Sequence, residues 1–334
     1  AKLSNKSIKI LGRSFNLLQV GITAAIASFA LIIRKGAEFG KALSNLKAVS
    51  GATKSEMKLL SNQAKELGAT TAFTANEVVG LQTELAKLGF TVKDIENSTP
   101  AILDLAASLE VGLASAAELA GSTVRSFGLS TKDTQRVVDV MALSTSSSAL
   151  NFDALRESLK LVAPTSRATG VSIEKTAALL GVLANNGLKG SVAGTGLSKT
   201  FIELNKKGIT LEEGMAKVAN SSNKLNTAID LVGVIGAKSF LSLAESGKEI
   251  DALETSFENA AGAAERMAEV KLDNLAGDTT KLSSAFEGFI LSIEDGEGLL
   301  NGIARAAVKA TTAILSFLTP TVSLTKAIED QRLA

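Results

Sequence analysis

The chain of 334 residues is almost neutral, with 35 Lys and Arg against 34 Asp and Glu, and it contains no His, Cys, Trp or Tyr. The lack of Cys excludes disulfides, a thiolate nucleophile and Cys-ligated zinc. The lack of His removes the commonest metal ligand and the commonest general base. Tight nucleic-acid binding needs concentrated basic residues and stacking aromatics, and neither is evident, so we expect none. We also expect no cofactor.

Small and aliphatic side chains dominate the composition. Hydrophobic residues make up 46% of the chain and aromatic residues only 4%. Such a composition favours helices packed at close range and disfavours sheets, which prefer aromatic and β-branched residues. We therefore predict an all-α fold, in which long coiled-coil-like helices flank a compact multi-helix domain.

The first predicted element is a long helix from about Ile8 to Leu46 in an N-terminal segment, residues 1–50. Its apolar residues recur at alternating spacings of three and four, which is typical of a coiled-coil seam. We predict that copies of the chain associate through this seam, whereas packing within one chain is the alternative. The seam comprises Ile8, Leu11, Phe15, Leu18, Ile22, Ala25, Phe29, Ile32, Gly36, Phe39, Leu43 and Leu46.

The middle of this helix has no charged residue between Arg13 and Arg34. About 20 apolar residues are long enough to cross a bilayer. Polar residues such as Asn16 and Gln19 interrupt the stretch, which is unusual for a simple anchor. Three interpretations stay open for residues 14–33: burial among copies or under other helices, insertion into a membrane, and ordinary core packing.

Residues 51–205 alternate helix-start and helix-stop signals. A Ser or Thr followed three residues later by an acidic residue caps a helix start, and glycine commonly follows a helix end. Helices of 10–18 residues joined by short loops predict a compact antiparallel domain. The start signals are Thr53–Glu56, Thr74–Glu77, Thr91–Asp94 and Ser130–Asp133, and the stop signals are Gly51, Gly68, Gly89, Gly112, Gly128, Gly170 and Gly187.

Two prolines and one similarity between segments bear on this domain. Pro100 is expected at the first position of a new helix, where its missing N–H costs nothing, and Pro164 is expected to kink or end a helix. The segments Phe73–Gly89 and Phe152–Gly170 are both helix-then-glycine units. An internal duplication is one interpretation, and the general pattern of helical hairpins is the other.

The glycine-rich stretch from Gly187 to Lys199 invites a phosphate-loop interpretation. The spacing does not fit, because a phosphate loop needs two glycines five apart followed by Lys and Ser or Thr. We instead expect the glycines to permit turns and to let a helix start close against a neighbour. Lys189 and Lys199 would then be solvated.

The pattern changes after residue 205. Residues 206–248 begin with a capping box, Thr210–Glu213, and are rich in glycine, so we predict a loosely packed helical connector. Residues 249–334 are predicted to hold a long helix from about Glu249 and an amphipathic helix that Pro320 ends. The long helix carries a second seam with the same spacing. That seam comprises Leu272, Leu275, Thr279, Leu282, Phe286, Phe289 and Ile293.

Three segments in the first two thirds of the chain are distinctive: "AEFGKALSNLKAVSGATKSEMKLLSNQAKELGATTAFTANEVVGLQTELAKLGF", "PAILDLAASLEVGLASAAELAGSTVRSFGLS" and "VVDVMALSTSSSALNFDALRESLKLVAPTSRATGVSIEKTAALLGVLANNGLKGSVAGTGL". Through these segments, residues 37–204 resemble the core region of phage tail tape-measure proteins. The resemblance covers about half of the chain with many matches in order.

The resemblance implies a structural, non-enzymatic protein that fills the tail tube or tip, sets tail length during assembly in the bacterial cytoplasm, and leaves ahead of the DNA. It implies as partners further copies of the chain (a trimer or hexamer), the tail tube, tail-tip or baseplate hub proteins, and the host membrane on ejection. A long repetitive ruler is missing, so we expect one section of a longer protein. A membrane-active helical pore that uses residues 14–33 and 299–318 is the alternative function.

Overall fold

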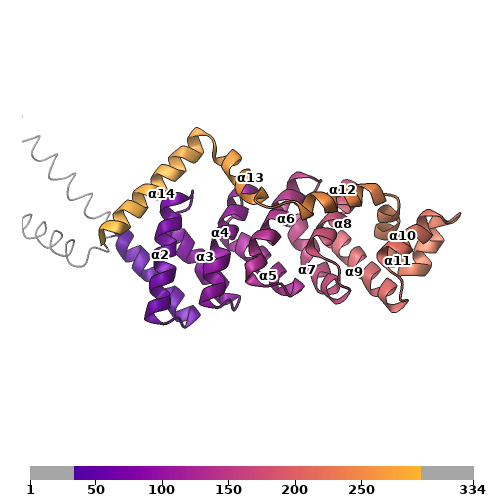
Figure 1. The fold of residues 1–334 in the computed structure, drawn as a ribbon, viewed down its shortest axis with the longest axis horizontal. Helices are drawn as coiled ribbons and strands as arrows, with labels where there is room; N and C mark the ends of the chain where they lie inside the picture. The colour runs from indigo at the N-terminus through magenta and orange to yellow at the C-terminus, as the bar shows by residue number, and fades with distance from the viewer. Residues whose placement is uncertain (1–33, 295–334) are drawn as a thin grey trace, which may run out of the picture. The chain divides into compact units, whose positions relative to one another are not determined.

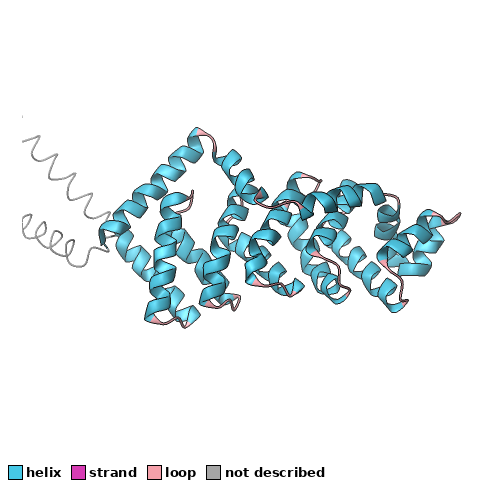
Figure 2. Ribbon diagram, in the orientation of Figure 1, coloured by secondary structure: helices cyan, strands magenta, loops and turns pink. Residues whose placement is uncertain are grey.

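The computed structural model describes residues 34–294, and within that range the chain forms helices and loops without strands (Figures 1 and 2). The predicted all-α class is confirmed. The chain divides into two units, residues 1–41 with 286–334, and residues 42–285. The second unit holds most of the described helices.

The first described helix covers residues 34–50 and ends at Gly51, as predicted. The others are α2 (Lys54–Thr70), α3 (Ala75–Lys87), α4 (Val92–Leu109), α5 (Leu113–Phe127), α6 (Thr134–Ser146), α7 (Phe152–Ala168), α8 (Ile173–Asn185), α9 (Ser191–Lys206), α10 (Leu211–Ala219), α11 (Lys224–Ala244), α12 (Gly247–Glu258), α13 (Ala263–Leu272) and α14 (Leu275–Glu294), with a short 3-10 helix at Thr131–Asp133.

The helices of the second unit form two layers of stacked pairs. In one layer α3, α5, α7, α9 and α11 each contact the next, and in the other α2, α4, α6 and α8 do so. Figure 1 shows the pairs side by side in one row. Each pair buries its apolar faces against the pairs on either side, as in α-solenoid proteins.

A three-residue turn recurs at the start of each of the five pairs. It consists of a glycine with φ between 63° and 79°, an apolar residue, and a Ser or Thr that caps the following helix. We call these the repeat turns, and successive caps are 38, 39, 42 and 38 residues apart. The repeat turns are residues 51–53, 89–91, 128–130, 170–172 and 208–210.

Each repeat turn ends one helix and begins another. In four of the five, the N–H of the apolar residue donates to a carbonyl five residues earlier, as Phe90 does to Leu85 and Val171 does to Ser166. This is the glycine-ended helix terminus known as a Schellman motif, and it uses carbonyls that would otherwise be unpaired. The two similar segments that end at Gly89 and Gly170 therefore lie two structural repeats apart.

The prediction that Pro100 begins a helix was wrong, and Pro164 does not end its helix. Pro100 lies inside α4 and Pro164 lies inside α7. Pro100 leaves the carbonyl of Glu96 without its helical donor. The side chain of Gln63 on α2 donates to that carbonyl at 2.7 Å. A tertiary hydrogen bond thus compensates for the one that Pro100 removes.

The glycines of α9 let it lie very close to two neighbouring helices, as expected. A methyl group on Gly194 would lie 2.7 Å from the carbonyl oxygen of Ser158 on α7. One on Gly196 would lie 2.1 Å from the hydroxyl of Ser239 on α11. Lys189 and Lys199 are exposed, which confirms their predicted solvation.

The segment predicted as a loosely packed connector forms α10 and α11, which make the fifth pair. The α11 helix packs against α9 and α10, and Phe240 on α11 is fully buried. The helix is interrupted at Gly233, whose φ of 75° and ψ of 169° are not helical. The glycines of this region therefore allow close packing and one break.

The long helix predicted from Glu249 is instead three helices. Breaks follow Glu258 and Leu272, so Leu272 and Leu275 belong to α13 and α14, and the predicted second seam is not continuous there. Gly262 with φ 72° precedes α13, and the side chain of Asn274 caps α14 by accepting from Gly277. Apolar residues keep the spacing of three and four from Leu272 to Leu275, across the second break. The spacing therefore predicted one continuous helix there.

We predict that Gly194→Ala lowers the free energy of unfolding by about 1–3 kcal/mol, because the new methyl group would overlap the backbone of α7. Gly80→Ala is the matched control. Gly80 lies inside α3 with nothing within 4 Å of an added methyl group, so this change should stabilise the chain by about 0.5–1 kcal/mol. Urea unfolding measures both, and equal effects would contradict the close approach.

Candidate functional surfaces

The first predicted seam lies mostly outside the described residues, since Ile8 to Ile32 precede residue 34. Of the remaining members, Phe39 is 4% exposed and Leu46 is fully buried, while Leu43 is half-buried. Burial of this kind accompanies packing in general. Self-association through the first seam therefore stays a prediction.

The second seam presents apolar side chains to solvent on α14. Leu275, Leu282 and Phe286 are 82%, 71% and 55% exposed. Their spacings of seven and four residues place them on one side of the helix. The side chains of Phe289 and Ile293 lie outside the described residues. The exposed stripe formed by Leu275, Leu282 and Phe286 is called the α14 stripe below.

The helices α12 and α13 run back across the even-numbered layer, α12 against α8 and α6, and α13 against α6 and α4. Asp139 on α6 is 2% exposed and anchors this return. Its two carboxylate oxygens accept from the N–H groups of Gly262 and Ala264, at 2.9 and 3.0 Å. A carboxylate at a helix N-terminus satisfies unpaired donors and complements the helix dipole.

The interface of α4 and α13 also concentrates carboxylates. Burial, together with the neighbouring negative charges of Glu265, Asp139 and Glu269, raises the pKa of Asp104 on α4 to about 7. Asp104 and the two glutamates line a cavity of about 240 Å³ together with Lys281. The interface therefore favours Asp104 in its protonated form.

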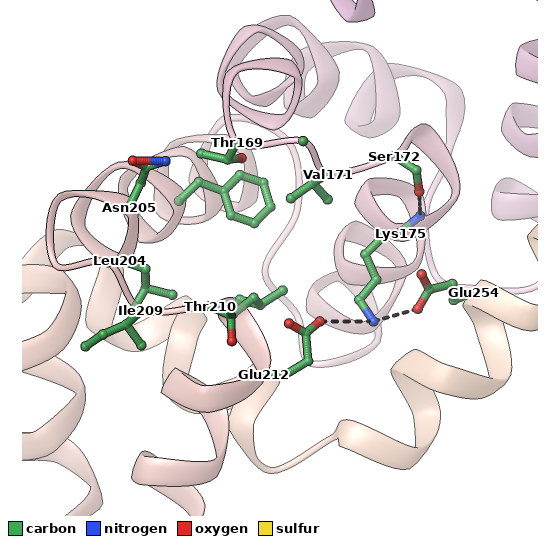
Figure 3. Close-up of a pocket in the computed structure, with 14 residues that line it drawn as sticks. Thr169, Val171, Ser172, Lys175, Leu204, Asn205, Ile209, Thr210, Glu212 and Glu254 are labelled. Carbon is green, nitrogen blue, oxygen red and sulfur yellow. Dashed lines mark hydrogen bonds and ion pairs between the residues drawn. The ribbon is translucent and has the colours of Figure 1, made fainter.

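A larger cavity of about 570 Å³ lies between the repeat turns 170–172 and 208–210 (Figure 3). Lys175 stands at one side of it, with its ammonium 2.5 Å from Glu254 and 3.7 Å from Glu212. Burial works against the charge of Lys175, but the ion pairs with Glu254 and Glu212 outweigh it and the pKa of Lys175 is raised. Lys175 is thus held as a cation, which excludes it as a general base at neutral pH.

The described residues offer no metal centre. Between residues 34 and 294 there is no group of three or more His, Cys, Asp or Glu that could hold a metal ion. In the larger cavity, the one lysine, Lys175, is paired with the carboxylates of Glu254 and Glu212.

One described helix, α11, is long and apolar enough to cross a bilayer by length and composition. Half of its most apolar window is buried, and Gly233 interrupts it. Its apolar residues mostly pack against the array, although Val234 and Ile235 are 77% and 64% exposed. The two segments of the alternative pore function, 14–33 and 299–318, lie outside the described residues.

Comparison with known proteins identifies the family to which the stacked helical pairs belong. The family described as "Phage-related minor tail protein" matches residues 61–285, which include α3 to α13. The chain belongs to this family. A "Tape measure protein" of Pneumococcus phage Dp-1 is 31% identical over 93% of this chain, and a "Probable tape measure protein" of Escherichia phage P2 is 30% identical over 92%. The predicted membership of the tape-measure proteins is confirmed.

The chain spans 30% of the length of the Dp-1 relative and 42% of the P2 relative. It thus corresponds to a section of these longer phage tail proteins. No solved structure matches the chain. Sequence reasoning missed the repeat turns of this tail protein section, although the regular spacing of Gly-apolar-Ser/Thr was readable.

We predict that Asp104→Asn stabilises this tail protein at high pH. The pKa of Asp104 in the folded chain is about 7, above its ordinary value of 3.8. The free energy of unfolding of the wild type therefore falls as the pH rises from about 4 to about 7, and it stays lower at higher pH. The variant has no carboxyl group at position 104, so its free energy of unfolding does not fall for this reason.

Urea unfolding at several pH values measures the effect. The advantage of the variant should be largest at pH 8 and should vanish near pH 4. Thr70→Asn, an exposed change beside the same cavity, is the control. An advantage that does not depend on pH would contradict the protonated state of Asp104.

Proposed function

We propose that the chain is a structural section of a phage tail tape-measure protein. The observation that carries the proposal is that the family match and both relatives cover the stacked helical pairs. In this role the chain fills the tail tube or the tail tip and contributes to tail length during assembly. It is then released ahead of the DNA at the host envelope.

The proposal treats the section as an assembly component and not as an enzyme. Its partners are further copies of itself, as a trimer or hexamer, the tail tube, and proteins of the tail tip or baseplate hub. Contact with the host membrane belongs to ejection. The exposed α14 stripe supports self-association, since apolar stripes of this spacing pair with other helices.

The described structure bears on how such a section would add length. A helix advances about 1.5 Å per residue, so one repeat of 39 residues laid out as a single helix would span about 60 Å. Stacked helices lie only about 8–10 Å apart, so the same repeat in the array adds about 10 Å. The contribution of each repeat to tail length therefore reports which arrangement the assembled tail contains.

Deletion of residues 89–127 from the complete tail protein tests the length function. This change removes α4 and α5 and joins Leu88 to Gly128, so one repeat turn replaces another. We expect tails shortened by about 60 Å if the helices lie end to end, and by about 10 Å if they stay stacked. Electron microscopy of tails measures the change.

A second copy of residues 89–127 inserted after Phe127 serves as the reciprocal control, and it should lengthen tails by the same amount. Both variants should still assemble, because each keeps the period of the array. Tails of unchanged length in both variants would refute a contribution of this section to tail length.

The α14 stripe allows a separate test of self-association. Leu282→Asp with Phe286→Asp places two charges on exposed positions, so the folding of the chain should be little affected, while an interface that desolvates them would be lost. We expect at least about a tenfold weaker self-association, measured by sedimentation.

Thr280→Asp with Ser283→Asp adds the same charge to exposed polar positions of α14 and is the matched control. It should associate like the wild type. Equal self-association of all three proteins would exclude the α14 stripe as the contact.

A further inference from the structure

Two arginines each pack against the repeat turn at the start of their own helical pair. Arg125 on α5 donates from Nη1 to the carbonyl of Leu88, directly before Gly89. Arg167 on α7 lies against Gly128, where an added methyl group would be 2.6 Å from its Cζ. Both arginines stand three residues before the glycine that ends their own helix. The same position thus places a guanidinium group against the glycine of a repeat turn in two successive repeats.

The next repeat has Asn205 at this position, three residues before Gly208. The shorter side chain does not cover the preceding turn, and nothing lies within 4 Å of a methyl group added to Gly170. The cavity of about 570 Å³ lies at this place and is lined by Thr169, Gly170 and Asn205. Figure 3 shows Thr169 and Asn205 at the side of this space away from Lys175.

The first repeat turn, 51–53, also lacks an arginine, because Ala86 occupies the equivalent position three residues before Gly89. Nothing lies within 4 Å of a methyl group added to Gly51. The later cavity differs because carboxylates line it. Glu212 and Glu254 bring two negative charges against the single positive charge of Lys175. Its charged lining residues therefore leave one net negative charge, which favours a cationic occupant.

The carbonyl of Thr169 corresponds to that of Leu88, because each precedes the glycine of its turn. A guanidinium group donates in a planar fork to carbonyl and carboxylate oxygens, and it tolerates partial burial better than an ammonium group. An arginine side chain therefore matches both the geometry of the neighbouring repeats and the charge of the cavity.

We propose that the cavity between the repeat turns 170–172 and 208–210 binds an arginine side chain from another protein chain. The incoming guanidinium takes the place that Arg125 and Arg167 hold in the earlier repeats. It contacts the Thr169 carbonyl and is drawn by Glu212 and Glu254. The site is a point of attachment in the row of helical pairs, and it does not depend on the proposed tape-measure function.

The probe for this site is N-acetyl-arginine amide, titrated into the complete chain and followed by amide chemical shifts. We expect saturable shifts at residues 169–172 and 208–212, with a dissociation constant on the order of millimolar for so small a ligand. N-acetyl-lysine amide should bind several-fold more weakly, because it has no planar fork.

Asn205→Arg supplies the missing arginine from within the chain and should weaken probe binding at least about tenfold. Asn220→Arg adds the same charge at an exposed position of the same unit and should leave binding unchanged. If Asn205→Arg does not fold, Glu254→Gln gives a second test by removing one carboxylate from the cavity, and it should also weaken binding.

Shifts that rise linearly without saturation, or that lie away from both turns, would overturn the proposal. Equal binding by wild type, Asn205→Arg and Glu254→Gln would overturn it as well. Sedimentation then separates two sources of the arginine. Loss of self-association in Asn205→Arg identifies a second copy of the chain, and unchanged self-association together with lost probe binding identifies a different protein. Neither result bears on tail length, so this test and that of the proposed function fail separately.

Discussion

The row of helical pairs depends on the repeat turn. Its glycine adopts a positive φ that other residues rarely tolerate, which stops one helix, and its Ser or Thr supplies a side-chain oxygen to start the next. Because the turn is only three residues long, the two helices are forced into neighbouring positions. Because the repeat turns recur at nearly constant intervals, each helical pair packs against the one before it. The glycine and the Ser or Thr of each turn thus determine how the pairs follow one another.

The contacts between pairs reuse a few positions. Glycines in α9 bring three helices together, and arginines cover two of the turns. Asp139 then fixes the returning helices by capping α13 from inside α6. A buried carboxylate in this place is satisfied by backbone donors, which offsets the cost of removing its charge from water. Where Asn205 replaces an arginine, the same architecture leaves an open and negatively lined space.

These features suit an assembly component. A row of pairs exposes many equivalent positions, and small changes at one of them create a distinct contact without altering the fold. The family match covers this row, and the chain spans 30% and 42% of the length of two curated relatives, so the row corresponds to one module of those longer proteins. One repeat adds only about 10 Å of length when its helices are stacked. The same residues in one continuous helix would add about 60 Å.

The sequence by itself determined the helical class, the helix starts at Thr53, Thr91 and Thr210, and the stops at glycines such as Gly89, Gly128 and Gly170, because capping depends on residues three or four positions apart. The stops predicted at Gly68 and Gly112 were wrong, since Gly68 lies inside α2 and Gly112 is the N-cap of α5. The sequence also identified the family. Only the tertiary structure decided that Pro100 stays inside a helix, since the compensating donor, Gln63, is 33 residues away. The break between α12 and α13 likewise has a distant partner, since Asp139 lies 123 residues before Gly262. Local chemistry fixes where helices begin and end, but which groups meet across the array depends on distances that only the folded chain sets.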